Sequence, residues 1–159
     1  MNIAGINYES MSDAEGVACV IYISGCKHKC KGCHNPQTHD FNYGIPFTND
    51  LLIQINSELK KRPFLNAIVL SGGDPMYSAK ELINIIPQLY LSNKKVWCYS
   101  GFLMKEIQQD YNMNKLLNLC DVLVDGLFQI NDRDITLPFR GSSNQKLWRK
   151  KDGEWILWQ

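Results

Sequence analysis

The chain has 159 residues, of which 45% are hydrophobic and 21% are charged, and its formal net charge is +1. A chain of this length is expected to fold as one domain, residues 1–159, around a single core. Its near-neutral charge does not indicate nucleic-acid binding, and no apolar stretch of about 18 residues predicts a membrane span. The N-terminus lacks the pattern of a signal peptide, so we expect a cytoplasmic protein whose thiols stay reduced.

Four short segments rich in β-branched and aromatic residues predict buried parallel strands, because each segment ends in turn-forming residues. They are Val17–Ser24, Asn66–Gly72, Lys95–Gly101 and Asp121–Gly126. Helical patterns lie between them. This alternation is typical of right-handed strand–helix–strand units, in which ligands bind at the carboxyl ends of the strands.

Two of the three expected helices have simple boundaries. The first is capped by Thr48 or Asn49 and runs to about Lys61, where the apolar periodicity ends. The last is expected to cover Phe102–Leu119 without interruption. Both would connect one predicted strand to the next.

The middle helix is expected to begin at Ser78 and to run to about Ser92. Glu81 stands three residues after Ser78, at the position that completes a capping box. Pro87 interrupts this segment at mid-length, so a kink or an early end is expected there.

The C-terminal segment departs from the alternating pattern. Two runs rich in tryptophan flank Lys151, Asp152 and Gly153, which predicts a closing hairpin with an Asp-Gly turn. With at most five or six strands, the chain is too short for an eight-stranded barrel, which takes about 250 residues. We therefore predict an α/β fold, a partial and open barrel of about five or six mostly parallel strands.

Three of the six cysteines, Cys26, Cys30 and Cys33, follow the first predicted strand within eight residues. A structural zinc site would need a fourth ligand, which His28, His34 or His39 could supply. An iron–sulfur cluster held by three thiolates would keep one iron open for chemistry. The spacing alone leaves both alternatives open. The other cysteines, at positions 19, 98 and 120, are expected to be buried thiols of hydrophobic character.

The cysteine spacing together with the motif SGGDP, Ser71–Pro75, resembles the radical S-adenosylmethionine superfamily. Further blocks, VWCYSGF, CDVLVDGLF and LPFRGSSNQ, are similar to the activating proteins of anaerobic ribonucleoside-triphosphate reductase. The resemblance implies that Cys26, Cys30 and Cys33 hold a 4Fe-4S cluster, whose open iron binds S-adenosylmethionine. It also implies a reductive cleavage that yields a 5′-deoxyadenosyl radical, and the radical removes hydrogen from a glycine of the large reductase subunit.

The SGGDP motif carries the first group of predicted cofactor contacts. Gly72 and Gly73 lack a Cβ atom, so backbone carbonyls can approach a ligand's ammonium group closely. Asp74 adds charge or shapes the turn. Ser100 and Gly101, at the end of the third predicted strand, are expected to line the same pocket. A purely structural strand-to-helix turn would explain the same residues.

Three further residues are candidates for binding roles. Asp125, at the end of the fourth predicted strand, could bind a ribose hydroxyl, although an Asp-Gly turn would also explain it. His34 follows the last cysteine of the motif, where members of the resembling family commonly have an aromatic residue, and its ring could stack on adenine. Arg140 could bind a carboxylate of the cofactor or of the partner through two hydrogen bonds.

Three alternatives concern partners and function. The lysines and His28 around the cysteines could dock an acidic electron donor such as flavodoxin, or could simply be solvated. A small-molecule radical enzyme, such as the radical synthase of the deazaguanine pathway, is the rival within the superfamily. A zinc or iron–sulfur module without enzymatic activity is the rival from another class, and metal analysis would separate it.

Overall fold

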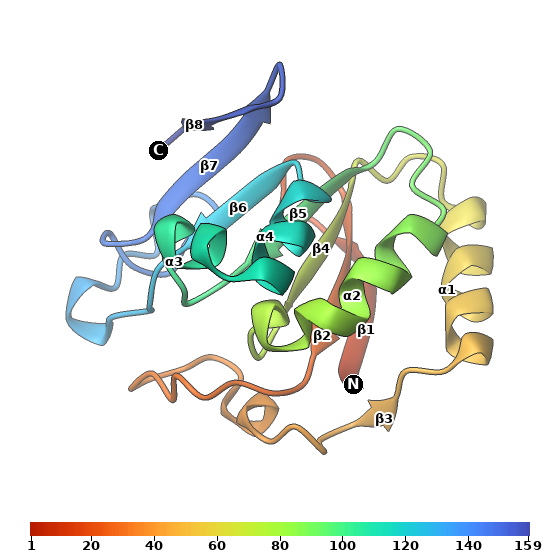
Figure 1. Ribbon diagram of the computed structural model, residues 1–159, viewed down its shortest axis with the longest axis horizontal. Helices are drawn as coiled ribbons and strands as arrows, with labels where there is room; N and C mark the ends of the chain where they lie inside the picture. The colour runs from red at the N-terminus through yellow and green to blue at the C-terminus, as the bar shows by residue number, and fades with distance from the viewer.

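The computed structural model describes residues 1–159 and contains one eight-stranded sheet flanked by helices (Figure 1). The strands lie in the order β3-β1-β2-β4-β5-β6-β7-β8. Their bounds are Asn2–Ser10 for β1, Ala18–Ile23 for β2, Ile45–Pro46 for β3, Ala67–Gly72 for β4, Lys95–Tyr99 for β5, Val122–Asp125 for β6, Lys146–Lys151 for β7 and Glu154–Leu157 for β8.

The four predicted strands are confirmed as β2, β4, β5 and β6, and they pair in parallel at the centre of the sheet. The predicted strand number and the mostly parallel character are wrong. The sheet has eight strands, and β1, β3, β7 and β8 add four antiparallel pairings at its two sides. The chain therefore forms a mixed α/β sheet, and its strand order does not confirm a partial barrel.

Strand β1 was not predicted because its sequence, NIAGINYES, contains Asn, Gly, Ser and Glu, which are uncommon in strands. Its pairing with β2 is also irregular, with register shifts between Ile3 and Gly5 and between Asn7 and Ser10. The predicted hairpin is confirmed as β7 and β8. Asp152 and Gly153 have φ values of 52° and 85°, the left-handed conformations that this two-residue turn requires.

Helix α1, Asn49–Lys61, matches its predicted range, and the Thr48 side chain accepts a hydrogen bond from the Leu51 backbone N–H at its start. Helix α2, Ala79–Ile85, is shorter than expected. It continues only as a 3-10 turn, Ile86–Gln88, because Pro87 has no backbone N–H to donate. The Ser78 side chain makes no capping hydrogen bond, so the predicted capping box is wrong.

The helix predicted over residues 102–119 is two helices, α3 at Met104–Gln109 and α4 at Tyr111–Asn118. The break lies at Asp110, whose backbone is extended. Its carboxylate accepts hydrogen bonds from the backbone N–H groups of Asn112 and Met113, both at 2.9 Å. Capping of the second helix therefore ends the first one.

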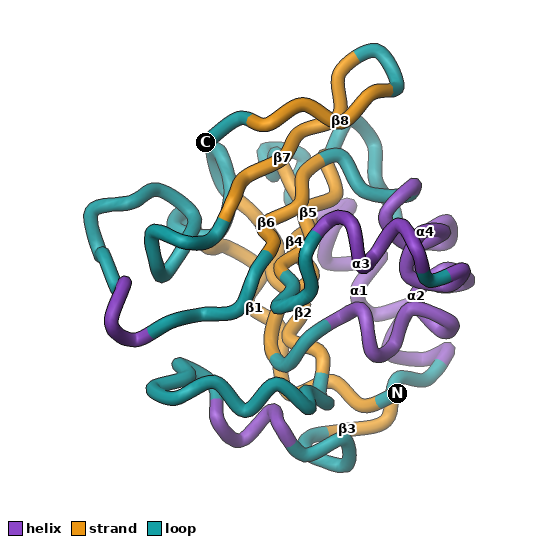
Figure 2. The backbone as a smooth tube through the Cα atoms, turned by 60° about the vertical axis from the view of Figure 1, so that its left-hand side comes forward, coloured by secondary structure: helices purple, strands orange, loops and turns teal.

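The two faces of the sheet are covered differently, because the helices lie on one side of the strands and long loops lie on the other (Figure 2). The helix side holds a continuous core of 23 buried residues, which includes Ile55, Leu82 and Ile107. The loop side has only seven buried core residues, among them Trp97 and Val122. None of the helices has the length and apolar character needed to cross a membrane.

Candidate functional site

A cavity of about 640 Å³ lies on the loop side of the sheet, at the carboxyl ends of the parallel strands. The loop after β2 contributes Cys26, Cys30 and Cys33 to its wall. The β4 end contributes Ser71 to Asp74, and the β5 end contributes Ser100 and Gly101. Parallel strands end at one edge of a sheet, so these distant motifs meet there as the sequence predicted.

The three cysteines of the loop have different environments. Cys26 is buried, whereas Cys30 and Cys33 are half-buried. Burial raises the pKa of the Cys26 thiol to about 11, although the backbone N–H groups of His28 and Lys29 act in the opposite direction. Burial also raises the pKa of the Cys30 thiol, against the effect of the Phe128 backbone N–H. Metal binding must therefore displace a proton, and these N–H groups would stabilise the resulting thiolates.

The two glycines of SGGDP are required by the approach of one backbone to another. Gly72 has φ of 106°, and a Cβ atom there would lie 2.5 Å from the backbone of Ile23. A Cβ atom on Gly73 would lie 2.6 Å from the Gly25 carbonyl oxygen and 2.7 Å from that of Thr38. The glycines thus let the β4 turn pack directly on the cysteine loop, while both line the cavity.

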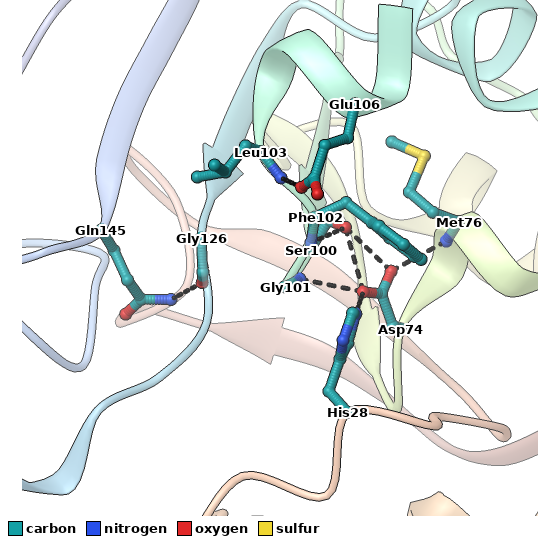
Figure 3. A network of polar contacts seen from close by, with 10 residues as sticks. All are labelled: His28, Asp74, Met76, Ser100, Gly101, Phe102, Leu103, Glu106, Gly126 and Gln145. Atoms are coloured by element: carbon teal, nitrogen blue, oxygen red, sulfur yellow. Dashed lines mark hydrogen bonds and ion pairs between the residues drawn. The ribbon is translucent and has the colours of Figure 1, made fainter. Parts of the chain in front are cut away.

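Asp74 shapes this turn, and its carboxylate is fully occupied by hydrogen bonds (Figure 3). The side chain is only 1% exposed and accepts hydrogen bonds from four donor groups. Their distances from the carboxylate oxygens lie between 2.8 and 3.0 Å, and the donors are the Met76 and Gly101 backbone N–H groups, the Ser100 hydroxyl and the His28 ring. Asp74 therefore acts here as a structural anchor.

Arg140 lines the cavity, and its guanidinium group retains binding capacity. Nη1 donates a hydrogen bond to the Gln145 carbonyl oxygen at 3.0 Å, while the buried Nε has no partner. The neighbouring Gln145 side chain is used internally, because its Oε1 accepts from Gly141 and its Nε2 donates to the Gly126 carbonyl oxygen. Within the RGSSNQ segment, Arg140 is thus the residue best able to bind an anionic group.

The remaining two predicted binding residues differ in position. His34 lines the cavity, and its ring centroid lies 5.5 Å from that of Phe128. Asp125 is buried outside the cavity lining, and its Oδ2 accepts a hydrogen bond from the Met104 backbone N–H at the start of α3. Asp125 therefore caps a helix in this structure, and its other carboxylate oxygen has no partner.

Several residues of the cavity wall were not predicted from the sequence, among them Asp13, Tyr22, Tyr99 and Phe128. Strand alternation could have identified Tyr22, because it shares a sheet face with Val20 and Ala18. The Tyr99 hydroxyl donates a hydrogen bond to the Asp13 carbonyl oxygen at 2.9 Å. Burial, followed by the nearby Asp13 carboxylate, raises the pKa of Tyr99. No local signal indicated that the loop after β1 would cover this face.

The donor set of the cavity fits an iron–sulfur cluster. It provides three thiol groups from one loop, and cysteine thiolates are the usual ligands of such clusters. No three His, Cys, Asp or Glu side chains converge as ligands of a single metal ion. Of the three histidines considered as a fourth zinc ligand, His28 binds Asp74 and His34 packs near Phe128, while His39 lines the cavity.

Comparison with known proteins agrees with this donor set. Residues 12–148 match the family model described as a 4Fe-4S single cluster domain. The chain is 33% identical to the anaerobic ribonucleoside-triphosphate reductase-activating protein of Pasteurella multocida, over 86% of this chain and 90% of that protein. It is 33% identical to the protein of that name from Haemophilus influenzae, over 87% and 92% of the two chains.

The similarity extends to a third relative of the same name, from Escherichia coli. That protein is 34% identical over 82% of this chain and 86% of its own length. The region that matches the family model, residues 12–148, includes the cysteine loop, the β4 turn and the cavity-lining segment around Arg140. The chain therefore belongs to the family of anaerobic ribonucleoside-triphosphate reductase-activating proteins, whose members share a 4Fe-4S single cluster domain.

Proposed function

We propose that this chain, acting as one domain of residues 1–159, is a radical S-adenosylmethionine enzyme that activates the anaerobic ribonucleotide reductase by generating its glycyl radical. The observation that carries the proposal is the meeting of three loop thiols with the β4 turn and the β5 end in one cavity. Family membership supports the same activity, because the relatives are named as activating proteins of that reductase.

Cys26, Cys30 and Cys33 would hold the 4Fe-4S cluster. When bound, the cluster supplies one electron that cleaves S-adenosylmethionine into methionine and a 5′-deoxyadenosyl radical, which then takes a hydrogen atom from a glycine of the reductase. The chain's own contribution is to hold the thiolates, to place their backbone N–H partners and to bury Cys26 away from water.

The cavity wall would bind S-adenosylmethionine. Carbonyl groups of the Ser71–Gly73 turn suit an ammonium group, and this turn packs on the cysteine loop itself. Arg140 would bind a carboxylate, because its Nε is buried without a partner. His34 and Phe128 would provide flat surfaces for adenine. We assign no ligand contact to Asp74, since four donors already occupy its carboxylate.

A protein substrate is favoured by the apolar residues near the cavity. Leu127, Ile130 and Ile135 lie in the segment that covers this side of the sheet, and each is at least 38% exposed. Around the cysteines, Lys27, Lys29 and Lys31 are exposed and form a basic collar. This collar would attract an acidic electron donor such as flavodoxin.

Electron paramagnetic resonance of the reduced enzyme mixed with the reductase and S-adenosylmethionine tests the function. With the reductase glycine deuterated at its α-carbon, deuterium should appear in 5′-deoxyadenosine, and the radical doublet should lose its hydrogen splitting. A normal radical yield without deuterium transfer would exclude direct abstraction. If no radical forms on any reductase subunit, a small-molecule substrate becomes the better explanation.

A further inference from the structure

His28 lies inside the cysteine motif but is not a solvated loop residue. Its side chain is only 14% exposed, although the lysines on either side of it are exposed. The ring centroid lies 4.6 Å from that of Phe102 in an edge-on arrangement, and 5.4 Å from that of Tyr77. The solvated interpretation of this residue is therefore wrong, and its burial requires an explanation.

The ring is held by a hydrogen bond of 2.9 Å between its Nε2 and Oδ2 of Asp74, as Figure 3 shows. A carboxylate only accepts hydrogen bonds, so Nε2 carries the proton. The same carboxylate binds Ser100 and Gly101 at the β5 end. One buried anion thereby joins three segments that are far apart in the sequence, and losing any donor would leave part of its charge uncompensated.

Gly101 gives independent support, because its backbone leaves space for the imidazole ring. A Cβ atom at Gly101 would lie 2.6 Å from Cδ2 and 2.8 Å from Nε2 of His28. The β5 end and the cysteine loop therefore fit together only when position 101 has no side chain. Gly101 was predicted to line the cofactor pocket, and the His28 ring also packs against it.

The ring position determines where the neighbouring backbone points. His28 stands midway between Cys26 and Cys30 in the sequence, and the next residue, Lys29, has a left-handed φ of 50°. If the His28 ring were released, this backbone segment would lose the hydrogen bond to Asp74 and the ring's contacts with Tyr77 and Phe102. The environment of the Cys26 sulfur would change even though the sulfur ligand itself remained.

We propose that His28 and Asp74 are a positioning pair, which holds the cysteine loop against the ends of β4 and β5 and thereby sets the retention and the electronic environment of the bound cluster. The inference rests on the proposed function only in requiring that Cys26, Cys30 and Cys33 hold that cluster. Partners that orient metal ligands commonly change metal affinity by about 10-fold to 100-fold when they are removed.

Two substitutions separate the hydrogen bond from the packing of the ring. His28→Gln keeps an N–H donor near the position of Nε2 but loses the aromatic ring. His28→Phe keeps a ring but removes the donor, which leaves the Asp74 carboxylate with one partner fewer. Gln37→Ala is the matched control, because Gln37 is uncharged, is exposed in the same segment between β2 and β3 and does not line the cavity.

The measurement is the rate at which anaerobically reconstituted protein loses iron to a chelator, together with the resonance spectrum and midpoint potential of the cluster. We expect His28→Phe to lose iron about 10-fold faster than wild type, with an altered spectrum and potential. His28→Gln should stay within about threefold of wild type, and Gln37→Ala should be unchanged. Combining His28→Phe with Asp74→Asn should add less than the sum of the single effects.

Wild-type iron retention, spectrum and potential in His28→Phe would overturn the proposal. It would also be overturned if His28→Gln and His28→Phe lowered the melting temperature of the metal-free protein equally and left the cluster unaffected. That result would give the His28 ring only a packing role. None of these readouts uses the reductase. A wild-type protein that binds a cluster but forms no glycyl radical would therefore contradict the proposed function and leave this test intact.

Discussion

Both faces of the sheet contain three cysteines, but the two sets have opposite surroundings. On the helix side, Cys19, Cys98 and Cys120 lie in the apolar core and are at most 1% exposed. Burial raises the pKa of Cys19 to about 12, and the hydrogen bond with Cys120, followed by burial, raises the pKa of Cys98. These thiols remain protonated and behave as small apolar groups.

On the loop side, the three cysteines line a cavity, and backbone N–H groups near Cys26 and Cys30 favour the thiolate. The same residue type therefore packs a core on one face and is available as a ligand on the other. The comparison teaches that position relative to the sheet, and not the number of cysteines, determines which thiols do chemistry.

The largest expected effect is the loss of the cluster. Replacing Cys26, Cys30 or Cys33 by alanine should abolish cluster assembly, because each removes one of three protein ligands. Cys98→Ala should leave the iron content intact. Iron and acid-labile sulfide per chain, measured after anaerobic reconstitution, distinguish the two sets, and stoichiometric zinc without sulfide in the wild type would contradict the assignment.

A substitution at Gly72, where the end of β4 packs on the end of β2, should have the next largest effect. Gly72→Ala forces a left-handed backbone conformation on an L-residue and a 2.5 Å approach to the Ile23 backbone. We expect the free energy of unfolding to fall by roughly 3 kcal/mol, measured by denaturant titration. Gly5→Ala is the control, because its added Cβ meets no atom within 4 Å. Equal losses of unfolding free energy in the two variants would show that the close backbone approach at Gly72 does not matter for stability.

A polar change in the core should cost stability without affecting metal content. Cys19→Ser buries a hydroxyl group among apolar side chains, so we expect unfolding to become easier by about 1–3 kcal/mol. Iron and sulfide content after reconstitution should stay at the wild-type level. A loss of iron in the folded variant would mean that the two faces are not independent.

On the cavity side, Arg140→Lys keeps the positive charge but loses the planar group that binds a carboxylate through two hydrogen bonds. We expect activation of the reductase to fall about tenfold, which corresponds to roughly 1.4 kcal/mol, while cluster content stays normal. Radical yield per cluster measures the effect. Unchanged yield would exclude a carboxylate contact at this residue.

The smallest effect concerns an ion-pair cluster on helix α1. Hydrogen bonds from Lys61 and then Arg62 lower the pKa of Glu58, so the folded state favours its ionised form. This stabilisation is present above the ordinary glutamate pKa of about 4.3 and is lost as the pH falls through the lowered value. Glu58→Gln should slightly lower the melting temperature at neutral pH and should match wild type in acid.

Much of the fold and of the site could be predicted because local patterns carry them. The four parallel strands, the Thr48 cap and the Asp-Gly hairpin depend on residue types within a few positions of one another. The cysteine loop and the β4 turn could be brought together because the ends of parallel strands share one edge. That inference needs only the strand assignment and not the side chains.

The parts that were missed depend on contacts between distant segments. Asp125 turned toward α3 and not toward the cavity, because its carboxylate accepts a hydrogen bond from Met104. The helix break at Asp110 is the exception, because it depends on a local cap that the sequence analysis missed. The role of Asp74 depends on His28 and Ser100, which are 46 and 26 residues away. Three-dimensional proximity of this kind leaves no periodic trace in the sequence.

The parallel pairing of β2, β4 and β5 has a consequence for the maturation of the protein. During synthesis the cysteines emerge early, but the residues that hold their loop follow much later, up to Gly101. An isolated peptide carrying the cysteines would therefore lack its support. We therefore expect stable insertion of iron and sulfide to require about two thirds of the chain, up to the β5 end that supports the loop.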